Sequence, residues 1–86
     1  MIKKLYVLTH CSGESNEKPE VFTTLERARK EMDDAYKLHL YDFDSDGEII
    51  KEYECVESNI FDDTAIITWP DDAYDRWDIF EVEVIL

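Results

Sequence analysis

The alternation of apolar and polar residues predicts four main strands. Lys3–Cys11 is rich in β-forming residues, and apolar residues occur at both its odd and its even positions, which favours a strand that is central in its sheet or covered on both faces. Glu48–Glu57 and Ala65–Trp69 have the composition of two further strands, and Val21–Phe22 forms a short extended piece.

The last predicted strand, Arg76–Leu86, has the strongest two-residue period in the chain. One of its faces carries Phe80, Val82, Val84 and Leu86, and the other carries Trp77, Ile79, Glu81 and Glu83. Pro70 precedes this strand, in a loop that ends the strand before it, because proline cannot donate to a sheet ladder.

A helical period occurs between the first and second of these strands. Thr23 fits the N-cap of a capping box with Glu26 three residues later, and Thr24 fits nearly as well. The helix is expected to run to about Leu40. Its apolar stripe consists of Leu25, Ala28, Met32, Ala35, Tyr36 and His39.

The resulting order, β-α-β-β-β, predicts an α+β fold. Residues 1–86 are expected to form a single two-layer domain, with one helix packed on a mostly antiparallel sheet of about four strands. Turns are expected at Asp42–Glu48 and at Ser58–Asp63, which separate the predicted elements.

Charge divides the chain into two unequal parts. Residues 1–41 hold seven acidic and seven basic residues, whereas residues 42–86 hold fifteen acidic residues and only Lys51 and Arg76, so the whole net charge of −13 lies in the second part. Such a surface repels anionic lipid and nucleic-acid backbone. The sequence therefore predicts no direct binding of DNA, RNA or membranes.

The N-terminal apolar run, Leu5–Leu8, is too short for the hydrophobic region of a signal peptide, and no segment reaches transmembrane length. The sequence therefore predicts a cytoplasmic protein. Its two cysteines, Cys11 and Cys55, are expected to be reduced and partly buried.

The run from Asp42 to Ile49 matches the first eight positions of an EF-hand loop, with Asp42, Asp44 and Asp46 as candidate calcium ligands. The twelfth position, however, is Tyr53 rather than a bidentate glutamate. A charged helix-to-strand turn is the favoured interpretation, and a weak calcium site is the alternative.

Other catalytic and metal-binding patterns receive little support. His10, Cys11, His39 and Cys55 are the soft ligands of the chain, and their spacing is not that of a zinc site. The sequence contains no P-loop and no nucleophile elbow. We therefore expect a protein without catalytic activity, cofactor or bound metal.

The acidic half is the candidate partner-binding surface. A one-signed surface accelerates encounter with a basic groove, and aromatic residues beside it supply apolar anchors. The candidate residues are Asp62, Asp63, Asp71, Asp72, Tyr74, Asp75, Trp77 and Asp78, with the 71–78 segment as the best single patch. The alternative is a solvated hairpin loop with Trp77 folded over the sheet, in which acidity serves solubility alone.

Three segments carry a resemblance to known proteins: Lys4-Leu-Tyr-Val-Leu-Thr-His10, Val21-Phe-Thr-Thr-Leu-Glu-Arg-Ala28, and Asp71-Asp72 with Trp77-Asp-Ile-Phe-Glu-Val-Glu-Val84. Over most of its length the chain resembles small acidic uncharacterised proteins of Firmicutes and of their phages and mobile elements. The resemblance implies no activity or functional residue. The phage setting suggests, by analogy of class, an inhibitor of the anti-CRISPR or anti-restriction type.

Two functional hypotheses follow. The first is a non-catalytic, DNA-mimic-like inhibitor that occupies the basic groove of a nuclease or another nucleic-acid-binding enzyme. The second is a structural domain without a heterologous partner, which associates with itself through an edge strand.

Overall fold

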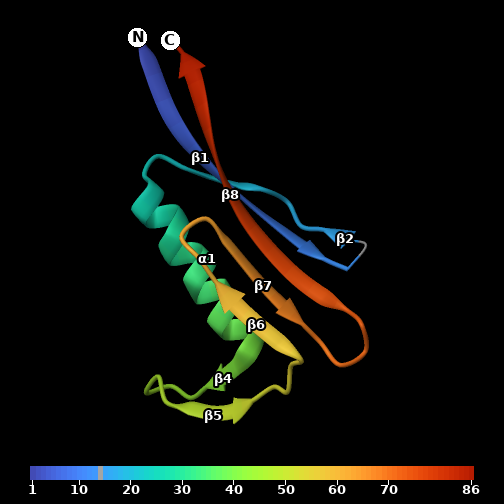
Figure 1. Cartoon of the computed structure of the whole chain (residues 1–86). Coiled ribbons are helices and arrows are strands. Elements are labelled where there is room, and N and C mark those ends of the chain that lie inside the picture. Colours follow the sequence, from blue (N-terminus) through green and yellow to red (C-terminus); the bar gives the residue numbers. More distant parts are fainter. Residues whose placement is uncertain (14) are drawn as a thin grey trace.

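The computed structural model describes residues 1–13 and 15–86. One helix lies against a twisted sheet, and a small hairpin extends from the end of the helix (Figure 1). The elements in chain order are β1 Ile2–Ser12, β2 Ser15–Asn16, β3 Glu20–Phe22, α1 Leu25–Leu40, β4 Tyr41–Phe43, β5 Ile49–Glu52, β6 Glu57–Ile60, β7 Thr64–Thr68 and β8 Tyr74–Ile85.

All strand pairs are antiparallel. The main sheet has the order β2-β1-β8-β7-β6, β3 pairs with β1 beside β2, and β4 and β5 form a separate two-stranded sheet. The longest pairing joins β1 to β8, from Ile2 opposite Ile85 to Ser12 opposite Asp75. The α+β class with one helix and a mostly antiparallel sheet is thus confirmed.

The expected number of about four strands is wrong, because the described residues form eight strands in two sheets. The predicted strand Glu48–Glu57 divides into β5 and the first residue of β6. The backbone N–H of Tyr53 donates to Leu40, and that of Val56 donates to Thr68, so the chain crosses from the small sheet to the large one. The predicted turn Ser58–Asp63 is correspondingly too long, since residues 58–60 pair with β7.

The helix begins at Leu25, with Thr24 as its N-cap. The Thr24 hydroxyl accepts a hydrogen bond from the Arg27 amide at 3.3 Å, so the second of the two predicted caps is the one adopted. The expected apolar stripe is confirmed by the burial of Ala28, Met32 and Tyr36 against the sheet. At the other end, the Tyr41 amide donates to Lys37, and the chain continues directly into β4.

The core lies between α1 and one face of the sheet. Trp77 is 1% exposed, and Ala65 and Ile67 of β7 are fully buried beside it. The register of β8 confirms the predicted two-residue period, and Trp77 and Ile79 lie on its covered face. About 2 kcal/mol of stabilisation is typical for burying each such apolar side chain.

The other face of the sheet is open. The register places Val7 opposite Phe80 and Leu5 opposite Val82, and Phe80 remains 53% exposed. Of the two alternatives predicted for β1, the central position agrees with the sheet order, because β1 lies between β8 on one side and β2 and β3 on the other. Coverage on both faces does not, because the single helix packs on only one face. Among residues 1–13 and 15–86, no helix combines the length and apolarity needed to cross a bilayer.

Candidate functional site

The predicted partner-binding residues divide into two exposed groups and a buried pair. Asp62 and Asp63 precede β7, whereas Asp71 and Asp72 follow it. The five residues of β7 span about 17 Å, so these two acidic groups lie at opposite ends of one strand. Asp62 and Asp63 are therefore separate from the 71–78 segment that was predicted as the best single patch.

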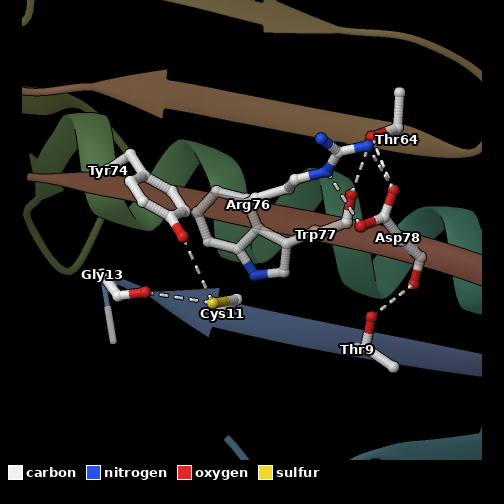
Figure 2. Close-up of polar contacts among 8 residues, drawn as sticks. All are labelled: Thr9, Cys11, Gly13, Thr64, Tyr74, Arg76, Trp77 and Asp78. Atoms are coloured by element: carbon white, nitrogen blue, oxygen red, sulfur yellow. Dashed lines mark hydrogen bonds and ion pairs between the residues drawn. The ribbon is translucent and has the colours of Figure 1, made fainter. Parts of the chain in front are cut away.

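Tyr74 and Asp78 lie on the open face of β8 (Figure 2). The Asp78 carboxylate accepts hydrogen bonds from Arg76 Nε at 3.0 Å and from the Thr64 hydroxyl at 2.9 Å. Tyr74 is 38% exposed, and its hydroxyl lies 3.9 Å from Cys11 Sγ. Asp78 is thus largely neutralised by Arg76, which reduces its value as a contact for a basic partner.

Asp75 and Trp77 are buried, at 5% and 1% exposure, and cannot act as surface anchors in this conformation. Like Ile79, both occupy odd-numbered positions of β8, and the side chains at these positions lie on the face of the sheet that α1 covers. Trp77 is folded into the core, which agrees with the alternative weighed for this loop. A partner could contact these two side chains only if they left the core.

The highest local concentration of exposed carboxylates lies on the β4–β5 hairpin and the residues just after it. We call residues 41–54 the acidic hairpin. It carries Asp42, Asp44, Asp46, Glu48, Glu52 and Glu54 against a single base, Lys51, which gives a net charge of −5. In Figure 1 it projects from the end of α1, away from the two chain termini.

The calcium-like run forms the turn of this hairpin. Asp44 Oδ1 accepts hydrogen bonds from the amides of Asp46 and Glu48, both at 2.9 Å, and Asp42 Oδ2 accepts one from the Tyr53 hydroxyl at 2.7 Å. That hydrogen bond raises the pKa of Tyr53 above its ordinary value. The segment that follows is strand β5 rather than the exiting helix of an EF-hand, as the favoured interpretation predicted.

Apolar side chains lie among these carboxylates. Ile49 is 56% exposed and Ile50 is 65% exposed, and Tyr53 contributes a ring that lies 4.6 Å from the Lys51 ammonium. Residues of this kind in an otherwise charged patch mark interaction surfaces. Charge and exposed apolar surface therefore coincide on the acidic hairpin, rather than in the 71–78 segment.

The concentration of like charges predicts that salt stabilises the fold. Two carboxylates about 6.7 Å apart, such as Glu81 and Glu83 on one face of β8, repel by about 0.6 kcal/mol in water. Raising salt from about 10 mM to about 1 M shortens the screening length from about 30 Å to about 3 Å. We expect the melting temperature to rise by about 5 °C or more over this range. A melting temperature that stays constant would contradict this prediction.

A second site lies under the C-terminal end of α1, around the buried Asp75. Its Oδ1 is 2.8 Å from His10 Nε2, and its Oδ2 accepts a hydrogen bond from Trp69 Nε1 at 2.7 Å. His39 Nε2 lies 3.8 Å from the same Oδ1. Burial opposes ionisation of Asp75, but the hydrogen bonds from Trp69, His10 and Ser12 and the nearby His39 outweigh it and lower the pKa of the carboxyl group.

His10, His39 and Asp75 together could hold a metal ion. Among residues 1–13 and 15–86, no other group of three or more histidine, cysteine or carboxylate side chains is close enough to do so. The sequence indicated His10 and His39 as metal ligands only together with the two cysteines, and it placed Asp75 in a surface loop. One signal was available in the spacing: Asp75 lies two residues before Trp77 and four before Ile79, so on a strand the three side chains share a face. Another was the place of His39 in the apolar stripe of the helix.

Comparisons with known proteins leave the family open. No family model, curated protein or solved structure matches the chain. The resemblance to acidic proteins of Firmicutes and their phages thus remains a prediction from the sequence.

Proposed function

We propose that this chain is a non-catalytic protein-binding domain that presents its acidic hairpin to the basic groove of a nucleic-acid-binding enzyme. The observation that carries the proposal is the exposure of Ile49 and Ile50 among six carboxylates on a hairpin outside the main sheet. Carboxylates steer the encounter, and apolar side chains supply affinity once water is excluded.

The charge of the molecule supports mimicry of a nucleic acid. The domain carries a net charge of −13, and the acidic hairpin alone carries −5 within 14 residues. A groove that binds the phosphates of a DNA strand can therefore meet a cluster of negative charges on this protein.

The test measures inhibition of DNA cleavage by a panel of nucleases with basic grooves, with a short DNA duplex as competitor. We expect inhibition of at least one nuclease, weakened by rising salt and by added duplex. Two variants that each remove four charges locate the surface. One carries Asp46→Asn, Glu48→Gln, Glu52→Gln and Glu54→Gln, and the other carries Asn at positions 62, 63, 71 and 72.

The hairpin variant should lose inhibition by about 10-fold or more, and the loop variant by much less, although both have the same net charge. Equal losses would show that only total charge matters, which contradicts a role for the hairpin. Ile50→Ser should weaken binding without changing its salt dependence, because it removes apolar contact and no charge. Failure to inhibit any member of the panel would argue against the proposal.

The open face of the sheet favours a second candidate, self-association. Val21, Phe80 and Val82 are 61%, 53% and 42% exposed there, and the register places Val7 between the first two. A second copy would cover this face, but two copies of a chain with a charge of −13 repel each other. Sedimentation should therefore show dimers only at high salt. Phe80→Ser should abolish them if this face is the interface.

A further inference from the structure

The cluster around Asp75 joins three elements that are distant in sequence. His10 comes from β1, His39 from the last turn of α1 and Asp75 from the start of β8. Their ligand atoms all lie within 4.8 Å of one another. Two imidazoles and a carboxylate form a donor set that is typical of zinc sites with one open position.

Two of the three separations between ligand atoms are close to those of a coordination sphere. With ligand bonds of about 2.1 Å, two tetrahedral ligands of zinc lie about 3.4 Å apart. The separations from Asp75 Oδ1 are 2.8 Å to His10 Nε2 and 3.8 Å to His39 Nε2, one shorter and one longer than this value. Shifts of less than about 1 Å would thus bring both separations to the tetrahedral value.

The hydrogen bonding of His39 determines which of its nitrogens is available to a metal ion. His39 Nδ1 lies 2.9 Å from the carbonyl oxygen of Ala35, which can only accept, so Nδ1 carries a proton. The other nitrogen, Nε2, lies 3.8 Å from Asp75 Oδ1 and is therefore the one placed to coordinate a metal ion beside that carboxylate.

The surrounding residues hold the three ligands in place. Asp75 Oδ2 is fixed by Trp69 Nε1, and the His10 ring stacks on Trp77 at 4.4 Å with an interplanar angle of 10°. The His39 ring meets Trp77 edge-on at 4.9 Å. Metal ligands are commonly oriented by such outer hydrogen bonds, including one from the second nitrogen of a histidine to a backbone carbonyl.

A cavity gives access to the cluster. It has a volume of about 350 Å³, and both His10 and His39 line it. Glu17, Glu20 and Glu31 also line it, together with Lys18 as the one base. The excess of carboxylates attracts cations, and the opening leaves room for water in a fourth coordination position.

We propose that His10, His39 and Asp75 bind one divalent transition-metal ion of the zinc class, with a water molecule or a partner's side chain as the fourth ligand. None of the three ligands belongs to the acidic hairpin, although His39 lines a pocket with Asp42 and Tyr53. Since its ligands come from a helix and two strands, the bound ion links α1 to the centre of the sheet. Zinc is thus expected to stabilise the fold.

Titration of the metal-free protein with zinc tests the proposal, with calorimetry and a chromophoric chelator as readouts. We expect one equivalent of zinc to bind with a micromolar or lower Kd, and magnesium and calcium at the same concentration not to compete. The melting temperature should rise by about 10–20 °C when free zinc exceeds Kd by 100-fold. Cobalt should give the visible absorption of a tetrahedral site.

The variants His39→Gln and Asp75→Asn separate this site from the many surface carboxylates. Both should weaken zinc binding by 10-fold or more, whereas Cys11→Ser and Cys55→Ser should leave it unchanged. Trp69→Phe removes the hydrogen bond to Asp75 and should weaken binding by about 10-fold, as expected for a residue that positions a ligand. Circular dichroism verifies that each variant is folded.

Three results would overturn the proposal: no stoichiometric binding, binding that His39→Gln leaves intact, or equal competition by calcium. The last two would indicate adventitious binding to carboxylates. None of these three results tests inhibition by the acidic hairpin. Nuclease inhibition is measured both with and without a zinc chelator, so the zinc site and the inhibitory function can fail separately.

Discussion

Trp77→Ala is expected to destabilise the domain by about 3–5 kcal/mol, because the substitution leaves a large cavity at the centre of the core. The Trp77 ring is 1% exposed, it stacks on His10, and it meets the rings of Tyr36 and His39 edge-on. A domain of this size has a total stability of about 4–13 kcal/mol. The variant should therefore be partly or fully unfolded in water.

Urea unfolding at neutral pH measures this effect. Phe61→Ala is the matched control, since the Phe61 side chain is 61% exposed and its loss should change stability by less than about 1 kcal/mol. A Trp77→Ala variant with unchanged stability and weakened partner binding would show instead that the ring is a surface anchor, as the sequence predicted.

Asp75→Ala is the second large effect that we expect. The substitution leaves the Trp69 indole N–H and the His10 ring without their acceptor, in a region of low exposure. Each buried donor left without a partner costs about 1–3 kcal/mol. Asp75→Asn should be milder, because the amide oxygen can still accept one of these hydrogen bonds.

The pH dependence of this contribution has a definite sign. The folded structure lowers the pKa of Asp75. The carboxylate therefore stabilises the fold fully above its unfolded pKa of about 3.9, and the contribution is lost as pH falls through the lower folded value. Unfolding of the wild type and of Asp75→Asn should be compared between about pH 7 and pH 3. The difference in stability should shrink as pH falls below about 4, whereas between about pH 7 and about pH 4 it also includes the interaction of the carboxylate with His10 and His39.

This comparison cancels the effect of the other acidic residues, whose protonation relieves repulsion in both proteins. A difference that did not shrink below about pH 4 would mean that folding does not lower the pKa of the carboxyl group. That outcome would contradict the assignment of Asp75 as an ionised acceptor.

Sequence periodicity predicted the parts of the fold that depend on local pattern. The helix stripe from Ala28 to Tyr36 and the two faces of β8 follow directly from periods of 3.6 and two residues. Strand β6 was missed because Glu57-Ser-Asn has little β propensity, and an edge strand needs only backbone hydrogen bonds to its neighbour.

The two candidate sites were harder to predict, because each depends on non-local packing. Asp75 was assigned to the surface on account of its charge, although it shares a face with Trp77. Nothing local indicates that β1 lies beside β8, which is what brings His10 to Asp75. Likewise, Ile49 and Ile50 have the composition of a core strand, and only the separation of β4 and β5 from the main sheet exposes them.

The position of β8 also determines the order in which this domain can fold. It lies between β1 and β7 and pairs with both. Two neighbouring strands of this three-stranded unit, β1 and β8, therefore come from opposite ends of the described chain. Contacts between such distant segments slow folding, because a long loop must close before they form. During synthesis, α1 and the β6–β7 pair can form early. The apolar stripe of the helix can pack on β1, β3 and β7 at that stage, but its contact with Trp77 forms only when β8 joins the sheet.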